Sequence, residues 1–304
     1  MRTSLTLAAV ASIAFAGVSA LAQTDAKQPF LERIRAQQSV VASAPGAADG
    51  AAWLRLAILQ NDAAQFPAAE RSYRKSIALL KSGDPALLAT ALDQLGSMYV
   101  VTGRADRAEP LEMKALALRE RQNDRLGVGL SHMHLAALFV SQHQLSAAEA
   151  EAGTAVSLLV SNPASAATPE QQMTVLIHLA LVRCARGHSS AAIPDLQHAL
   201  TLARASYLPN SVPVGLLDFL LGYAEWKNGD TASAAAHMST GTQELATQLG
   251  WGHPTYVQAL HQYKTFLAQT GHANEAHQLE ARLSSFNPAH ANSSAAAPSL
   301  DLLP

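Results

Sequence analysis

The sequence predicts an all-α protein, an α-solenoid of about six helix–turn–helix repeats that form a curved superhelix. Three observations predict this class. Alanine is the commonest residue of the 304-residue chain, in which aromatic residues make up only 5%, and alanine has the highest helix propensity. Small residues recur at intervals of 39 to 44 residues. Glycine follows the first helix of most copies, where a turn between two helices is expected.

The first 22 residues have the pattern of a cleaved secretory signal. Arg2 lies beside the amino terminus, Leu5–Val18 carries no charge, and small residues end the segment before Gln23. The apolar run is too short to span a bilayer comfortably, so no stable membrane insertion is expected after cleavage. The single cysteine, Cys184, permits no intrachain disulfide. These features predict a protein secreted across the inner membrane into the bacterial periplasm.

Two segments flank the repeats. Pro29–Ser43 is expected to form a helix, because proline suits a first turn and apolar residues follow on one side. Ala44–Gly50 has the glycine and proline content of a linker. Residues 23–50 are therefore expected to be an N-terminal helix and linker. Residues 287–304 are rich in Ala, Ser, Pro and Asn and are expected to be a disordered tail.

Three positions define the repeat. The second helix of each copy contains an alanine: Ala69, Ala108, Ala148, Ala192, Ala234 and Ala276. Twelve residues earlier, the first helix carries a residue that is small in five of six copies: Ala57, Gly96, Ala136, Ala180, Gly222 and Lys264. Five residues before each alanine lies the expected turn: Ala64, Gly103, His143, Gly187, Gly229 and Gly271. Two antiparallel helices approach closely where both carry a small residue, and stacked hairpins bury a continuous core. Arg183 and Glu225 share a further repeat position, which predicts an ion pair between successive repeats.

These features resemble the tetratricopeptide repeat (TPR) family. The match includes the small residue of each helix, the leucine before the first, the turn glycine, and Trp53 and Leu92 at the large consensus position. The long period and the sequences Leu92–Leu95 and Ala108–Leu111 are similar to the kinesin-light-chain-like subclass, whose repeats span about 42 residues. The resemblance covers Ala51 to Phe286, and it implies repeats near residues 51–88, 89–127, 128–170, 171–212, 213–254 and 255–286.

The resemblance also implies that the first helices line a concave groove whose exposed residues contact a partner. The expected groove residues are Asp93, Gln94, Ser97, Met133, His134, Ile177, His178, Phe219, Tyr223, Trp226, His261 and Gln262. Phe219, Tyr223 and Trp226 are spaced i, i+4, i+7 and share one helical face. Ordinary core packing is the alternative for these three aromatic residues. The groove lacks the Lys/Asn set with which some TPR proteins bind a C-terminal carboxylate, so that mode of binding is not expected.

The sequence contains none of the common catalytic or nucleotide-binding motifs. His132 and His134 point to different sides of one helix and cannot share a metal ion. His134 and His178 occupy the same position in neighbouring repeats and could face one ligand. Scattered histidines without a cysteine or carboxylate set instead favour two polar groove residues. We therefore expect no catalytic residue, no metal, no cofactor, and an inert thiol at Cys184.

The function predicted from these observations is a non-catalytic scaffold that binds a peptide or partner segment in its concave groove, in the bacterial cell envelope. One alternative is a structural or assembly factor of a larger envelope complex. A His-dependent metal-binding protein or enzyme is the less favoured alternative. The formal net charge of −2 provides no basic surplus for a nucleic-acid backbone, so a nucleic-acid partner is not expected.

Overall fold

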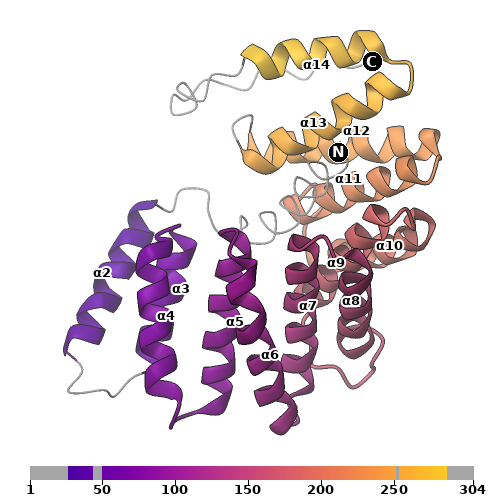
Figure 1. Cartoon of the computed structure of the whole chain (residues 1–304). Coiled ribbons are helices and arrows are strands. Elements are labelled where there is room, and N and C mark those ends of the chain that lie inside the picture. Colours follow the sequence, from indigo (N-terminus) through magenta and orange to yellow (C-terminus); the bar gives the residue numbers. More distant parts are fainter. Residues whose placement is uncertain (1–26, 44–49, 251–252, 286–304) are drawn as a thin grey trace. The chain divides into compact units, whose positions relative to one another are not determined.

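The computed structural model describes residues 27–43, 50–250 and 253–285. All regular secondary structure in these residues is α-helical (Figure 1), which confirms the predicted all-α class. The expected signal segment, most of the expected linker and the expected tail lie outside the described residues.

Helix α2 (Lys27–Ser43) precedes six helical hairpins and includes the segment Pro29–Ser43, where a helix was expected. The hairpins are α3–α4 (Gly50–Asp62, Phe66–Leu80), α5–α6 (Pro85–Val101, Ala105–Arg121), α7–α8 (Arg125–Ser141, Leu145–Leu159), α9–α10 (Pro169–Ala185, Ser189–Ser206), α11–α12 (Val212–Lys227, Thr231–Leu249) and α13–α14 (Pro254–Gln269, Ala273–Ser285). Within the described residues this is the predicted architecture of six helix–turn–helix repeats.

Local sequence explains where α5 begins. The side chain of Asp84 accepts hydrogen bonds from the backbone N–H groups of Ala86 (2.8 Å) and Leu87 (3.4 Å), and Pro85 occupies the first helical position. An aspartate cap and a proline at this position both favour a helix start. The expected repeat boundary at residue 89 therefore falls inside α5.

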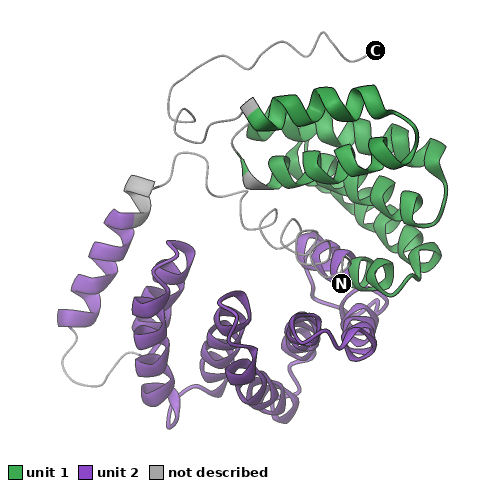
Figure 2. Ribbon diagram, turned by 45° about the horizontal axis from the view of Figure 1, so that its top comes forward, with its two compact units in different colours: residues 1–21, 179–304 green, residues 22–178 purple. Residues whose placement is uncertain are grey.

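The chain divides into two compact units, and the division falls within α9 (Figure 2). We call the described residues 27–178 the N-terminal unit and the described residues 179–285 the C-terminal unit.

In the N-terminal unit, α4 packs against α3 and α5, and α6 packs against α5 and α7. Helix α8 packs against α7, and its buried Ala155 and Leu159 cluster with Val175 of α9. The successive first helices α3, α5 and α7 also contact one another, more extensively than the successive second helices do. The small residues expected at the close helix contacts are buried: Ala57, Ala69, Gly96, Ala108, Ala136 and Ala148. The first helices therefore form a continuous row on one side of this unit.

In the C-terminal unit, α11 and α12 approach each other closely, because glycines replace side chains between them. A Cβ atom at Gly241 would lie 2.5 Å from the carbonyl oxygen of Gly215 and 2.5 Å from the backbone nitrogen of Phe219. The same closeness buries the side chain of Phe219 completely. The aromatic face of α11 is thus part of the interior of this unit.

The turn inside every hairpin has a left-handed residue at the position expected from the sequence. The six residues have φ between 56° and 91°: Ala64, Gly103, His143, Gly187, Gly229 and Gly271. In each turn the next backbone N–H bonds to the carbonyl five residues earlier, as from Arg104 to Tyr99 at 2.7 Å. This hydrogen bond closes the first helix and reverses the chain.

A polar contact recurs inside three hairpins, three residues beyond the small residue of each helix. Ser72 donates to Gln60 Oε1 (2.7 Å), Arg183 donates to Asp195 (2.5 Å), and Glu225 pairs with His237 (2.7 Å). The expected ion pair between Arg183 and Glu225 is therefore replaced by one pair within each hairpin. The reason is that the residues three positions beyond the two small residues face each other across a hairpin.

Candidate functional site

One side of helix α5 remains accessible, although α3, α4, α6 and α7 surround the rest of it. Thr90, Gln94 and Ser97 are half-buried and Val101 is 58% exposed, and their spacing places all four on one helical face. The equivalent accessible residues of the neighbouring first helices are Arg55, Ile58 and Asp62 on α3 and Leu130, His134, Ala137 and Ser141 on α7. We call these residues of α3, α5 and α7 the first-helix stripe.

Only part of the predicted groove lies on an accessible surface. Gln94, Ser97 and His134 belong to the first-helix stripe, His178 is half-buried at the equivalent position of α9, and His261 is exposed. Five predicted groove residues are buried: Asp93, Ile177, Phe219, Tyr223 and Gln262. Their assignment to an open surface is corrected here, whereas the contact of the accessible residues with a partner stays a prediction.

The physical reason is the helical angle between adjacent positions. Asp93, Ile177 and Phe219 all lie three residues before the small residue of their first helix, and the accessible Gln94 and His134 lie two residues before it. One step along a helix rotates the side chain by about 100°. A side chain three residues before the small residue therefore points into the packed interior, whereas one two residues before it points toward the accessible side.

The three aromatic residues of α11, Phe219, Tyr223 and Trp226, take part in helix packing, which was the alternative to a groove surface. Tyr223 and Trp226 meet edge to face with ring centroids 5.9 Å apart, and Trp226 meets Phe266 of α13 in the same way at 5.7 Å. The ammonium group of Lys227 lies 3.8 Å from the centroid of the Trp226 ring. Among the other predicted residues, Met133 packs against the buried Ala155, Leu159 and Val175. These side chains stabilise the helix packing.

A group of ionisable side chains is buried between the second and third hairpins. We call Asp93 of α5, Glu112 and Arg119 of α6, and Ser131 and His134 of α7 the polar cluster. Asp93 is 1% exposed, Glu112 is fully buried, and the His134 side chain is 15% exposed. Two of these five residues, Asp93 and His134, were predicted as separate groove positions, and the other three were not predicted to be functional.

Arg119 is the central donor of the polar cluster. Its Nη1 group donates to Asp93 Oδ2, to the Ser131 hydroxyl (2.6 Å) and to the Gly127 carbonyl (3.2 Å). His134 Nδ1 lies 3.4 Å from Asp93 Oδ2 and 3.7 Å from Glu112 Oε2. The guanidinium group thus fixes Asp93, while the imidazole faces both carboxyl groups.

The two adjacent hairpins have no charged residue at the acidic and arginine positions of the polar cluster. The first hairpin carries Leu54, Tyr73 and Leu80 there, and the third carries Met133, Ala152 and Leu159. Charges at positions that are apolar in the neighbouring copies were the signal that could have revealed the polar cluster from sequence. Three charged residues that meet in the interior, each at a position that is uncharged in the adjacent hairpins, indicate that charge is needed at this place.

The polar cluster shifts the acidity of its members strongly. Burial alone raises the pKa of Asp93, but His134, Glu112 and Arg119 outweigh it and lower that pKa to about 2. Burial raises the pKa of Glu112 to about 8, and the charge of Asp93 adds to this shift. Burial lowers the pKa of His134, but the two carboxyl groups raise it to about 10. Without a cation, the polar cluster therefore compensates its charges by holding protons.

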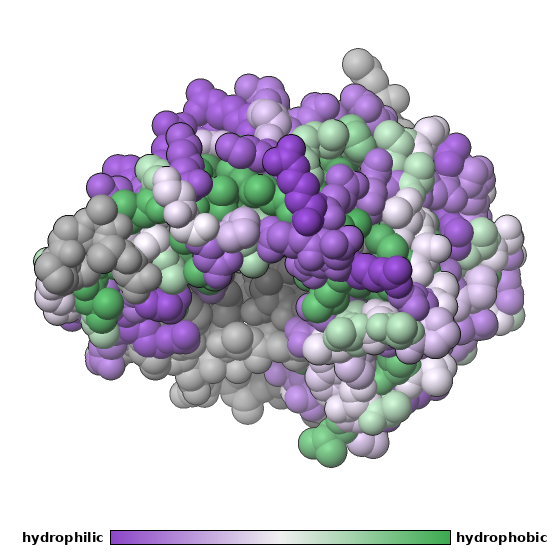
Figure 3. Space-filling view, turned by 90° about the horizontal axis from the view of Figure 1, so that it is seen from below, coloured by the Kyte–Doolittle hydropathy of each residue, from purple (hydrophilic) through white to green (hydrophobic). Residues whose placement is uncertain are grey.

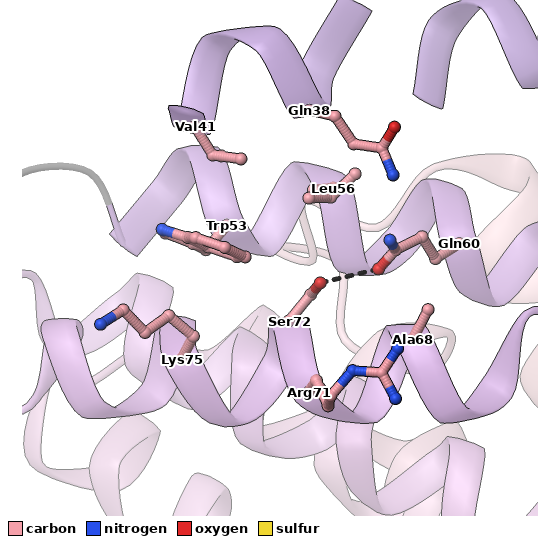
Figure 4. A pocket seen from close by; sticks show the side chains of 9 residues that line it. All are labelled: Gln38, Val41, Trp53, Leu56, Gln60, Ala68, Arg71, Ser72 and Lys75. Atoms are coloured by element: carbon pink, nitrogen blue, oxygen red, sulfur yellow. Dashed lines mark hydrogen bonds between the residues drawn. The ribbon is translucent and has the colours of Figure 1, made fainter. Parts of the chain in front are cut away.

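A pocket of about 420 Å³ lies between α2 and the first hairpin (Figure 4). Val41 of α2 and Trp53 of α3 face it, the Gln60–Ser72 hydrogen bond lies beside it, and the exposed Arg71 and Lys75 of α4 border it. Trp53, at the large consensus position of the first repeat, therefore lines a cavity.

The surface chemistry of the described residues is mixed. On the face shown in Figure 3, hydrophobic residues form separate patches between hydrophilic ones. None of the described helices is both long enough and apolar enough to span a membrane.

Comparison with known proteins shows the fold. No family model matches the sequence, and no curated protein matches it either. Similar solved structures include BtubC (BKLC) from P. vanneervenii, with a TM-score of 0.59, 19% identity, and coverage of 75% of this chain and 94% of that chain. A signal transduction ATPase from Pyrococcus horikoshii with a tetratricopeptide repeat sensor has a TM-score of 0.60 and 14% identity, over 72% of this chain and 35% of that chain. A Rap protein complexed with competence and sporulation factor has a TM-score of 0.58 and 12% identity, over 93% of this chain and 96% of that chain. The chain therefore shares the fold of TPR-type helical repeats.

Proposed function

We propose that this protein is a non-catalytic scaffold for protein–protein interaction, which binds a peptide or partner segment along the first-helix stripe. The observation that carries the proposal is the row of contacting first helices α3, α5 and α7, each with one accessible side. A partner lying across this row would contact three repeats at once. Each repeat would contribute a few side chains at a regular interval.

The chemistry of the first-helix stripe suits an extended segment. Gln94, Ser97 and His134 can hydrogen-bond to a partner backbone, and Arg55 and Asp62 place opposite charges on α3. Small side chains such as Ala137 leave room for the partner to approach the helix. The comparison with the Rap protein, which was crystallised with competence and sporulation factor, supports a binding role for such a fold by analogy.

The proposed location is the bacterial cell envelope. It rests on the N-terminal sequence, in which a charged start, an uncharged run and small residues form a secretory signal pattern. Fractionation of the native cells, with the mass of the purified protein, tests this step. A periplasmic protein that begins after Ala22 is expected, whereas a cytoplasmic protein that retains Arg2 would contradict the location without affecting the binding proposal.

Affinity capture from the native envelope fraction tests the binding surface. Val101→Arg combined with Ser97→Arg places two long cationic side chains on the first-helix stripe and should reduce capture of a specific partner at least about tenfold, because it blocks close approach to α5. Met113→Arg is the matched control, since Met113 is 53% exposed on α6, outside the stripe. Equal capture by both variants would show that the first-helix stripe is not the binding surface.

A further inference from the structure

We propose that the polar cluster binds one divalent transition-metal ion, with Zn²⁺ as the best-fitting ion and Asp93, Glu112 and His134 as its ligands. The site lies within the N-terminal unit, where three different helices, α5, α6 and α7, each supply one ligand. The proposal needs no partner protein and does not depend on the first-helix stripe being a binding surface.

The distances between the possible ligand atoms fit a zinc ion. The ligand atoms of Asp93, Glu112 and His134 all lie within 4.8 Å of one another. His134 Nδ1 is 3.4 Å from Asp93 Oδ2 and 3.7 Å from Glu112 Oε2. Zinc binds nitrogen and oxygen ligands at about 2.0–2.2 Å in a tetrahedron, which places adjacent ligand atoms about 3.4 Å apart. Only small side-chain movements would close the site around an ion.

Several buried ligand atoms have no hydrogen-bond partner. Within the described residues this holds for Asp93 Oδ1, both carboxyl oxygens of Glu112, and His134 Nδ1. Glu112 is the decisive residue, because its side chain is fully buried and points at the other two. An unpaired buried carboxyl group costs free energy unless a ligand satisfies it. A metal ion between these three side chains would satisfy all of them.

The surroundings of the polar cluster hold the ligands in place. Arg119 fixes Asp93 by donating to its Oδ2, and Arg119 is itself fixed by Ser131 and the Gly127 carbonyl. Gly96 makes room for Glu112, since a Cβ atom at residue 96 would lie 2.3 Å from Glu112 Oε1. Partners of this kind, outside the ligands themselves, orient metal ligands in proteins.

The charges of the polar cluster leave a place for a cation. Metal ligands lose their protons when they bind an ion. With Glu112 and His134 deprotonated in this way, the two carboxylates and the single guanidinium group sum to one negative charge. A buried excess charge requires a counterion or a proton. His134, which belongs to the first-helix stripe and is 15% exposed, gives an ion a route from solvent, and water can complete the coordination.

Titration calorimetry with ZnCl₂ tests the proposal on the purified full chain after removal of metals with a chelator. The wild type is expected to bind one Zn²⁺ per chain at the polar cluster, and its Tm should rise with Zn²⁺ concentration. Glu112→Gln and His134→Gln should each weaken this binding at least about a hundredfold, since each removes one of three ligands. His261→Gln is the matched control, because His261 is exposed on α13 and should leave the binding unchanged.

A cobalt spectrum provides a readout that does not depend on the variants. Co²⁺ bound to the wild type should give visible absorption bands of a low-coordinate nitrogen and oxygen site. Zinc binding that survives Glu112→Gln and His134→Gln, or a wild type that binds no Zn²⁺ with one-to-one stoichiometry, would overturn the proposal. The polar cluster would then be balanced by protons alone.

Discussion

At the scale of single residues, the hairpin turns differ in how well their residue suits the left-handed backbone. Gly103, Gly187, Gly229 and Gly271 adopt it without a side chain, whereas Ala64 and His143 hold φ of 56° and 60° with a Cβ atom. The closing hydrogen bond is the same in all six turns. Ala64 and His143 therefore reduce the stability of the protein, although their turns have the same hydrogen bond as the glycine turns.

Ala64→Gly should raise the free energy of unfolding by about 1 kcal/mol, because glycine adopts this conformation without steric cost. Gly103→Ala is the opposite substitution and should lower it by about the same amount. A Cβ atom at Gly103 meets no other atom within 4 Å, so any loss there arises from the backbone alone. Urea denaturation measures both, and equal stabilities of the two variants would contradict the argument.

Cys184 should be an unreactive thiol in the folded protein. Burial raises the pKa of Cys184 to about 11, with a smaller opposing effect of a hydrogen bond with Ser189. At pH 8 only about one thiol in a thousand is then ionised, and the thiolate is the reactive form. A chromogenic disulfide reagent should react slowly with the native protein and rapidly in urea. Equal rates in the two states would show that the thiol is accessible and not shifted.

At the scale of elements, α11 and α12 depend on the absence of side chains between them. Gly241→Ala would place a methyl group 2.5 Å from the backbone of α11, and it should lower the free energy of unfolding by about 1–3 kcal/mol. Gly153→Ala, in the middle of α8, meets nothing within 4 Å and should instead stabilise by about 0.5–1 kcal/mol through helix propensity. Thermal denaturation followed by circular dichroism compares the two. A stabilising effect of Gly241→Ala would show that the helices can separate without cost.

The helical hairpins could be predicted because their determinants are local and repeated. A small residue on each helix, twelve positions apart, and a left-handed turn between them recur in nearly every copy. The accessible surface could not be predicted as well, because a one-residue difference in position separates the buried Asp93 from the half-buried Gln94. The polar cluster depends on three helices meeting, and neither helix propensity nor periodicity contains that information.

At the scale of the N-terminal unit as a whole, the polar cluster replaces apolar packing between two hairpins. Arg119→Leu alone should lower the free energy of unfolding by about 3–5 kcal/mol, because it leaves Asp93 buried without its partner. The combination of Asp93→Leu, Glu112→Tyr and Arg119→Leu introduces the residues that the first hairpin carries as Leu54, Tyr73 and Leu80.

This triple variant should be at least as stable as the wild type, since well-packed apolar residues often match or exceed a buried ion group. Urea denaturation in chelator-treated buffer measures the comparison. A triple variant as unstable as Arg119→Leu would mean that the helix spacing here is specific to the charged residues. The same variant should have lost one-to-one Zn²⁺ binding.

The polar cluster also specifies which hairpins stack on one another. Repeats with purely apolar interfaces can exchange neighbours at little cost, and such arrays misassemble or swap segments between chains as they fold. The hairpin α5–α6 can bury its charges only against a neighbour that offers Ser131 and His134. At the position of Ser131 the other first helices carry an apolar residue: Ala52, Ala91, Val175, Leu217 or Ala259. Stacking against another hairpin would therefore leave the buried Arg119 without this hydrogen bond, at a cost of about 1–3 kcal/mol. The side chains at this interface thus specify the order of the two hairpins. They also disfavour the exchange of a hairpin between two chains that fold close together.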